Sequence, residues 1–254
     1  MRQIVVIALN TFRENLRDKI LYNLLLFAVL LMGVSVLLAD LTIMEHHKIV
    51  MDMGLASINL TGVMIAIFVG IGLVSKEIER RTVYTIMARP ISRTQFIIGK
   101  YLGLVITLSV NMLVMVAVLL VTMLLYRVPV QASLFQATEL MFVEVLVVTA
   151  MALCFSTFSS SALSAIMTIG LYATGHLTAD MKGIAEKSQS EAVKALMTGL
   201  YYICPNLEAL NIKGQAATGI PVTATYQALA TGYGLLYATV LVLSACAVFQ
   251  RRDF

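Results

Sequence analysis

A charged island, residues 75–100, lies between two long uncharged segments and constrains the fold of this chain more than any other feature. The island holds six of the eighteen Lys and Arg residues, opposed only by Glu77 and Glu79. Met53–Ser75 before it and Tyr101–Tyr126 after it contain no charged side chain. Each segment, as a helix, can cross a hydrocarbon core of ~30 Å. Because basic loops between spans stay in the cytoplasm, the island predicts a polytopic membrane protein and its orientation.

Composition supports this prediction. The chain is 59% hydrophobic and 13% charged, and its mean hydropathy is +0.89. These values favour a single all-α membrane domain spanning residues 1–254, in contact with the lipid bilayer. The net charge of +4 then reflects the basic bias of cytoplasmic loops, so we expect no nucleic-acid partner.

The uncharged runs predict the spans. They are Ile20–Ala39, Met53–Ser75, Tyr101–Tyr126, Val145–Ala179 and Gly214–Gln250. The fourth run holds two spans only if the first of them starts earlier and includes Glu144. Basic residues at both ends of the chain predict cytoplasmic termini, which require an even number of spans. We therefore expect six, with the last three at about Leu140–Phe158, Ser161–Thr178 and Tyr226–Phe249.

The distribution of basic residues agrees with this topology. Twelve Lys and Arg residues fall on the predicted cytoplasmic side and six on the other side. The bias has the direction expected of a multi-pass protein of the inner or plasma membrane.

The first nineteen residues predict an amphipathic helix. Apolar side chains recur every four residues, at Ile4, Ala8, Phe12, Leu16 and Ile20. Such a helix suits the inner face of the membrane, although a cytoplasmic extension of the first span fits the same pattern.

The outer segment, residues 179–225, predicts short extracytoplasmic helices before the sixth span. An apolar stripe from Met181 to Leu200 favours a helix that ends before Pro205 and packs on the outer mouth of the bundle. Gly214, Gly219 and Pro221 predict turns back into the membrane.

Sequence motifs of soluble enzymes are missing. The chain contains no His-Glu-x-x-His, no Gly-x-Ser-x-Gly and no phosphate-binding Gly-x-x-x-x-Gly-Lys-Ser/Thr. We therefore expect no catalytic residues, no cofactor and no ATP hydrolysis by the usual loop. Cys154, Cys204 and Cys246 are isolated, form no metal-binding pattern and are interpreted as packing residues.

Glu144 is the one carboxylate that the topology places inside a span. Charges at such positions usually face the bundle interior or a wet cavity, which makes Glu144 a candidate for lining a path. Ser164 and Thr168 are further candidates, because the fifth span is the richest in hydroxyl groups. A structural carboxylate and hydroxyls bonded to backbone carbonyls remain the alternatives.

Methionine and histidine cluster in the first outer loop, at Met44, His46, His47, Met51 and Met53. Thioether and imidazole ligands suit copper. However, fifteen methionines in the chain make such a cluster expected by chance, and metal binding by this group stays open.

The island has a local order of its own. Pro90 ends a short helical stretch that starts near Thr82, and Ser92-Arg-Thr-Gln95 has the pattern of a capping box that opens the third span. A short helix that displays charge toward the cytoplasm is typical of a docking element.

This island resembles the loop between the second and third spans in permease subunits of type 2 (type V) ABC exporters. The matching residues are Lys76, Glu77, Glu79, Arg80, Arg81, Thr82, Arg89, Pro90, Ser92 and Arg93, followed by Lys100. Arg81 departs from the pattern, because many members have glycine before the threonine. The six predicted spans, the amphipathic start and the Arg251-Arg252 end match too, so the resemblance covers the whole chain.

The resemblance implies a half-transporter. Two permease copies, or two related chains, would form a central path and pair with two separate ATPase subunits. The island would be the coupling helix in the ATPase groove, and ATP-driven closure would push it and open the path outward. Two alternatives stay open, an ATP-independent secondary transporter or channel and a non-transporting membrane assembly factor. The sequence does not identify the substrate or any accessory partner on the outer side. It also does not distinguish a homodimer from a heterodimer.

Overall fold

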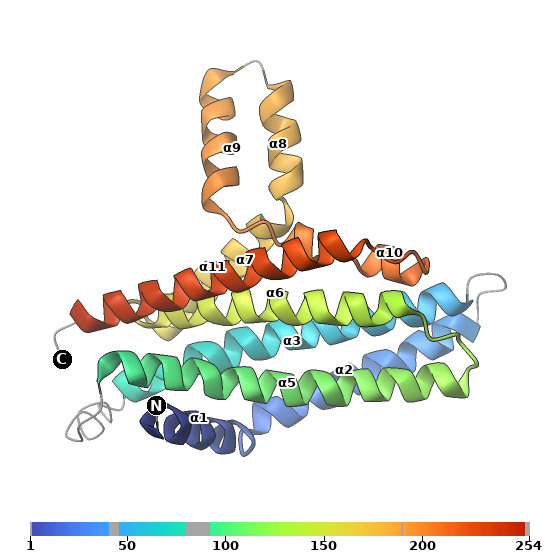
Figure 1. Cartoon of the computed structure of the whole chain (residues 1–254), viewed down its shortest axis with the longest axis horizontal. Coiled ribbons are helices and arrows are strands. Elements are labelled where there is room, and N and C mark those ends of the chain that lie inside the picture. Colours follow the sequence, from blue (N-terminus) through green and yellow to red (C-terminus); the bar gives the residue numbers. More distant parts are fainter. Residues whose placement is uncertain (1, 41–45, 80–91, 189, 252–254) are drawn as a thin grey trace.

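The computed structural model describes residues 2–40, 46–79, 92–188 and 190–251, and in these ranges all regular structure is helical. Five long helices form a bundle (Figure 1): α2 (Lys19–Asp40), α3 (His46–Glu79), α5 (Arg93–Leu125), α6 (Ala132–Ser156) and α11 (Ala224–Arg251). The shorter elements are α1 (Arg2–Asn15), α7 (Ser161–His176), α8 (Thr178–Lys187), α9 (Glu191–Ile203), the 3-10 turn η1 (Glu208–Leu210) and α10 (Lys213–Ala217). The predicted all-α class is confirmed.

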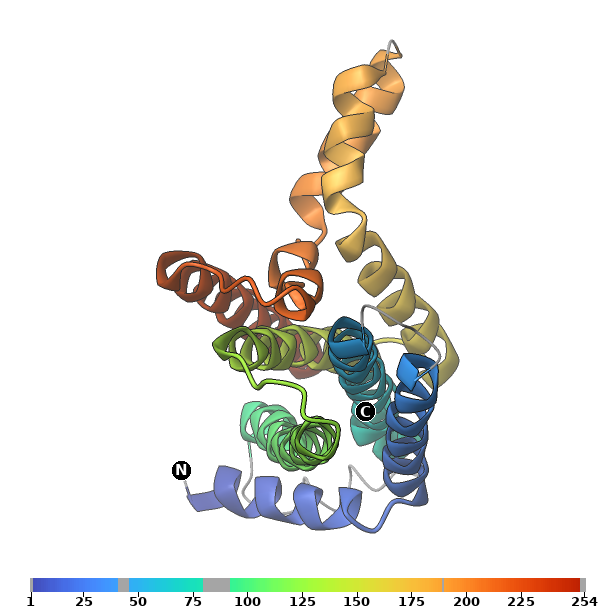
Figure 2. The same ribbon diagram turned by 90° about the vertical axis from the view of Figure 1, so that its right-hand side faces the viewer.

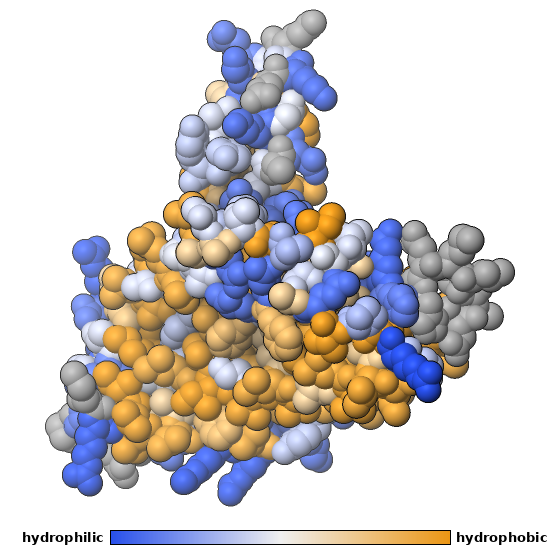
Figure 3. Space-filling view, turned by 45° about the vertical axis from the view of Figure 1, so that its right-hand side comes forward, coloured by the Kyte–Doolittle hydropathy of each residue, from blue (hydrophilic) through white to orange (hydrophobic). Residues whose placement is uncertain are grey.

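The same five long helices are long and apolar enough to cross a membrane. Figure 3 shows apolar residues in a broad band over the bundle, while hydrophilic residues gather on the part that stands away from it. The core lies where α6 packs against α3 and α11, and it includes Leu104, Val148 and Met151, all fully buried. The chain is therefore a multi-pass membrane protein.

The sixth crossing is not confirmed by the described helices. The predicted fifth span corresponds to α7, which has 16 residues and is about 24 Å long at 1.5 Å per residue. Its last residue, His176, contacts Glu144, which lies near the middle of α6. Because α7 starts beside the end of α6 and runs back along it, α7 covers only about half of its length. Six spans stay a prediction.

The fourth span starts earlier than its predicted boundary near Leu140, since α6 begins at Ala132. Glu139, the charged residue just before the predicted start of the span, does not end the helix. Its carboxylate accepts hydrogen bonds from the Gln227 amide and the Thr231 hydroxyl of α11, which stabilise it within the helix pair. Glu144 consequently lies much deeper than the expected position about five residues below the end of its span.

The outer segment differs from its prediction. Instead of one helix on the mouth of the bundle, α8 and α9 form an antiparallel hairpin that stands away from the bundle, steeply inclined to its long axis (Figures 1 and 2). None of the described α9 residues is buried. The helices separate at a turn in which the Ser190 N–H donates to the Ser188 hydroxyl at 3.2 Å, a side-chain bond that competes with helix continuation.

The predicted N-terminal helix is present as α1 and lies across the bundle axis (Figure 2). It is separated from α2 by a short turn in which Asp18 accepts a hydrogen bond from the Ile20 N–H at 3.0 Å. One face packs on the start of α5, where the Asn15 amide donates to the Thr107 hydroxyl at 3.1 Å. The opposite face leaves Val5 and Val6 more than half exposed. This geometry favours a separate helix over an extension of the first span.

Close approach of α1 to α5 depends on glycine. A Cβ atom at Gly103 would lie 2.7 Å from the Ala8 carbonyl oxygen, and one at Gly99 would lie 2.7 Å from Ile7 Cγ2. Replacing Gly103 by alanine should therefore force α1 away and destabilise the protein by about 1–3 kcal/mol. The measurement is the free energy of unfolding in detergent micelles. The control is Gly33→Ala in α2, where no atom lies within 4 Å of the added methyl group. Equal stability of both variants would contradict the close packing.

Candidate functional site

A buried polar network surrounds Glu144. This side chain is 0% exposed although it lies near the middle of a membrane-spanning helix. One carboxylate oxygen accepts a hydrogen bond from the Asn59 amide of α3 at 2.8 Å. The other lies 2.9 Å from Nε2 of His176, the last residue of α7. Three helices thus converge on one carboxylate.

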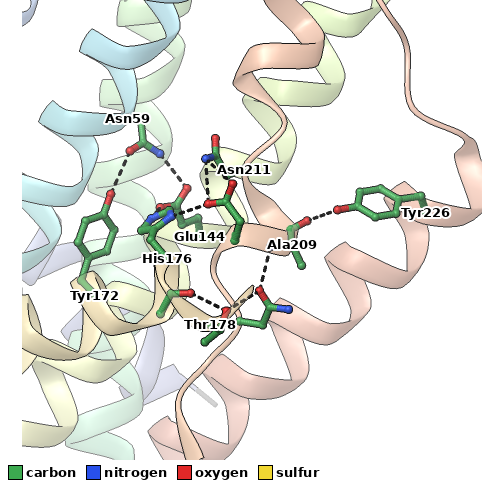
Figure 4. A network of polar contacts seen from close by, with 11 residues as sticks. Asn59, Glu144, Tyr172, His176, Thr178, Ala209, Asn211 and Tyr226 are labelled. Atoms are coloured by element: carbon green, nitrogen blue, oxygen red, sulfur yellow. Dashed lines mark hydrogen bonds and ion pairs between the residues drawn. The ribbon is translucent and has the colours of Figure 1, made fainter. Parts of the chain in front are cut away.

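The network continues beyond His176 (Figure 4). Its Nδ1 atom lies 3.1 Å from the Glu208 carboxylate in η1, and Glu208 also accepts from the Asn211 amide at 3.1 Å. On the other side, the Tyr172 hydroxyl donates to Oδ1 of the Asn59 side chain at 3.3 Å, and the Tyr172 ring packs edge-on against His176. The network therefore ties α3, α6 and α7 to the segment that precedes α11.

His176 lies between two carboxylates, so the hydrogen bonds that it donates depend on its protonation state. An imidazolium donates from both ring nitrogens, whereas a neutral imidazole donates from one and accepts at the other. If His176 is neutral, one of its ring nitrogens can only accept. The contact at that nitrogen is then a hydrogen bond only when the carboxyl group facing it, Glu144 or Glu208, is protonated. Both arrangements, the imidazolium and the protonated carboxyl group, contain one proton more than a neutral His176 between two ionised carboxylates. The three side chains thus form a chain of groups of the kind that exchange protons, running from the fully buried Glu144 to the partly exposed Glu208.

The other two predicted path residues lie on the same α7 face as Tyr172. Ser164 and Thr168 are both 0% exposed, and the Thr168 hydroxyl donates to the Ser164 carbonyl oxygen at 2.7 Å. The Ser164 hydroxyl has no hydrogen-bond partner within the described ranges. In a single chain all three candidates are packed in the interior, and whether they line a path stays a prediction.

The predicted docking loop is described only at its edges. Lys76, Glu77 and Glu79 lie in the last turn of α3, while Arg80, Arg81, Thr82, Arg89 and Pro90 lie outside the described residues. At the far edge the capping box is confirmed. The Ser92 hydroxyl accepts from the Gln95 N–H, and the Ser92 N–H donates to the Gln95 side chain, both at 3.2 Å. This cap fixes where the third long span starts.

Arg93 joins the start of α5 to the end of α11. Its guanidinium donates to the backbone carbonyls of Phe249 at 3.3 Å and Gln250 at 2.9 Å, in the last turn of α11. Basic side chains stabilise helix C-termini in this way, because the last carbonyls lack partners within the helix. The Gln250 amide donates back to the Thr94 hydroxyl at 2.8 Å, and the rings of Phe96 and Phe249 stack at 5.8 Å. We call these contacts the Arg93 junction.

The methionine and histidine group of the first outer loop is described only in part. Met44 lies outside the described residues, and His46, His47, Met51 and Met53 belong to the first turns of α3. Met51 is buried in the core. Across residues 2–40, 46–79, 92–188 and 190–251, no group of three or more His, Cys, Asp or Glu residues could hold a metal ion.

Comparison with known families decides the identity. The family model described as "ABC-2 family transporter protein" matches residues 5–254. The chain belongs to the ABC-2 transporter family. No curated protein matches it with statistical significance. The match agrees with the resemblance seen in the sequence, so the chain is the membrane permease component of an ABC transporter and not itself the ATPase.

Sequence reasoning about this ABC-2 permease missed most partners of Glu144. Asn59 is the one Asn or Gln residue in the uncharged run Met53–Ser75, and an amide side chain inside a span indicates a buried hydrogen bond. His176 falls near the outer end of the predicted fifth span and Glu208 in the outer segment, and neither position indicates a contact with Glu144. No spacing rule connects positions 59, 144, 176 and 208, because tertiary packing alone brings them together.

Proposed function

We propose that this ABC-2 permease is a single transmembrane domain that forms, as a dimer, the path of an ATP-driven exporter. Two copies of a separate ATPase would supply the energy, docked on residues 75–95. The observation that carries the proposal is the family match over residues 5–254, combined with the lack of a phosphate-binding loop in this sequence. A transporter subunit without that loop needs a partner that hydrolyses ATP.

We place the protein in the inner or plasma membrane, with both termini and the loop in the cytoplasm. The ends of the described chain support this orientation. The start of α1, the end of α3, the start of α5 and the end of α11 lie at one end of the bundle (Figure 1). Lys76, Arg93 and Arg251 belong to these helix ends and are among the basic residues assigned to the inside, in agreement with the positive-inside rule.

The Arg93 junction supports a route by which the docked ATPase would move the spans. Residues 80–91 connect α3 to α5, and Arg93 links the first turn of α5 to the last turn of α11. A push on the loop would reach both helices at once. Because α11 packs along α6, the push would also reach the helix that carries Glu144.

The position of the hairpin supports a second permease copy. The hairpin α8–α9 leaves the bundle beside His176, near the middle of α6, and carries Lys182, Lys187, Glu191 and Lys194. Charged side chains at that depth are costly in hydrocarbon. The side of the bundle that carries α7 would therefore face a water-filled space, as at the seam between two copies. This space would be the path, open to the outside.

Within that path, the network around Glu144 would hold the closed state. It ties α7 to α3, α6 and η1. Movement of α7 away from α6 would break these hydrogen bonds and expose Glu144, Ser164 and Thr168 to water. The three residues would then line the open path.

Reversing two charges beside the loop tests the docking surface. The double variant Glu77→Lys/Glu79→Lys should reduce recovery of the ATPase in a pull-down about tenfold or more, because long charged side chains form directional contacts across such interfaces. Folding should be unaffected, since the two positions end α3 at the edge of the bundle. The matched control is Glu191→Lys on the hairpin. Undiminished recovery of the ATPase with the double variant would contradict docking at this loop.

One observation favours a second candidate, a proton-driven secondary transporter. His176 lies between the Glu144 and Glu208 carboxylates near the middle of the bundle, and proton relays in such transporters are built from these groups. The two functions differ in their energy source. Solute movement driven by a pH gradient in vesicles that contain the permease alone would favour this candidate over the ATP-driven one.

A further inference from the structure

A groove between α5 and α6 lies apart from the Glu144 network. Its volume is about 580 Å³, within the range of small-molecule sites. Most of its wall is apolar, with Met112, Leu113 and Val116 on α5 and Phe135 and Phe142 on α6. These side chains recur at helical spacing, so each helix offers one continuous face to the groove.

A single carboxylate interrupts this apolar wall. Glu139 lines the groove about two turns into α6 and is exposed in the permease. Its oxygens accept hydrogen bonds from the Gln227 amide and the Thr231 hydroxyl of α11, both of them neutral groups. The ion pairs found in the described part of the chain involve other carboxylates, Glu14, Glu144 and Glu208.

The surroundings of Glu139 favour a positive ligand. A carboxylate in an apolar groove of a membrane-spanning helix is costly unless a positive charge compensates it. Phe135 and Phe142 lie four residues before and three residues after Glu139, so both rings stand one helical turn away on the same face. Aromatic faces attract organic cations that have left water. Carboxylate and rings thus offer complementary interactions to one chemical group.

We propose that this groove binds a lipophilic organic cation, with its charge at Glu139 and its apolar groups along α5 and α6. The carboxylate lies partway along the groove, with apolar walls on both sides, so the ligand carries apolar groups around its charge. A membrane lipid, whose charged group stays at the water interface, does not fit this pattern. The site goes beyond the proposed function, and binding to it needs no ATPase.

Tetraphenylphosphonium and tetraphenylborate test the proposal, because they have similar size and shape and opposite charge. The purified permease is placed in phosphatidylcholine nanodiscs, and equilibrium binding of each ion is measured against empty nanodiscs. We expect saturable binding of tetraphenylphosphonium only. Glu139→Gln, which keeps the size of the side chain and removes its charge, should weaken this binding about tenfold or more. The control Glu191→Gln, on the hairpin, should bind like the unmodified permease.

A second variant keeps the test independent of Glu139. Ala117 lines the groove from α5 and is exposed, so Ala117→Phe fills the groove without disturbing the core. This variant should also lose tetraphenylphosphonium binding, although it retains the carboxylate. Equal binding of the two ions by the unmodified permease would overturn the proposal. Undiminished tetraphenylphosphonium binding by either Glu139→Gln or Ala117→Phe would overturn it as well.

Discussion

Replacing His176 by leucine is expected to destabilise the permease by about 3–5 kcal/mol, because it leaves a fully buried carboxyl group without its imidazole partner. Glu144 is fully buried, and its two described partners are His176 and the neutral amide of Asn59. Without the imidazole, the carboxylate must stay charged in the interior or take up a proton of its own. Chemical unfolding in mixed micelles, followed by circular dichroism, measures the loss.

The double variant Glu144→Leu/His176→Leu provides the control for this result. It removes both members of the pair, and replacing a buried ion pair by apolar residues is often close to neutral. Most of the lost stability should therefore return, while Glu208 keeps its contact with Asn211 and Asn59 keeps its contact with Tyr172. A double variant that is less stable than His176→Leu would show that the cost arises from packing and not from an unpaired carboxylate.

The second large effect concerns Arg93. Replacing it by alanine removes the donor to the Phe249 and Gln250 carbonyls and loosens the junction between α5 and α11. If the junction transmits the push of the ATPase, Arg93→Ala should leave ATP hydrolysis by the complex largely intact and abolish opening of the path. Opening is measured at Thr168→Cys, with the three native cysteines replaced. This position is fully buried at rest, so a water-soluble maleimide should label it only during ATP turnover.

Two variants separate transmission from general damage to α11. Arg251→Ala, at the exposed end of the same helix, should retain ATP-dependent labelling at position 168. Arg93→Lys should restore part of it, because lysine donates to carbonyls but lacks the planar fork of arginine. Normal labelling in Arg93→Ala would mean that the junction only stabilises the end of α11.

Much of this fold is readable in the sequence because a bilayer imposes strong rules. Uncharged runs locate the long helices, and the Ser92–Gln95 pattern marks where α5 begins. The rules fail where tertiary hydrogen bonds hold a charged residue within a helix. The predicted fourth span starts just after Glu139, yet hydrogen bonds from α11 allow α6 to continue through it for two further turns toward Ala132.

Of the residues that form the polar network, the sequence analysis predicted only the central one, Glu144. Topology singles out Glu144 from the sequence, since it is the carboxylate that a span must include. Its environment depends on α7 ending near the middle of α6, where His176 reaches the carboxylate. Hydropathy favours a full crossing for that segment, because it does not reveal that α7 ends at His176, beside Glu144. The hairpin that follows was likewise expected on the outer mouth.

The central claim is that a separate ATPase drives this permease, and isolating the assembly from its native membranes tests it most directly. The permease is tagged, extracted in mild detergent and weighed intact by native mass spectrometry, and ATP hydrolysis is measured on the same sample. The proposal predicts two permease chains with two copies of an ATP-hydrolysing subunit, and no hydrolysis by the permease alone. A permease that is extracted at low salt with no ATP-hydrolysing partner, and moves solute in vesicles without ATP, would contradict it.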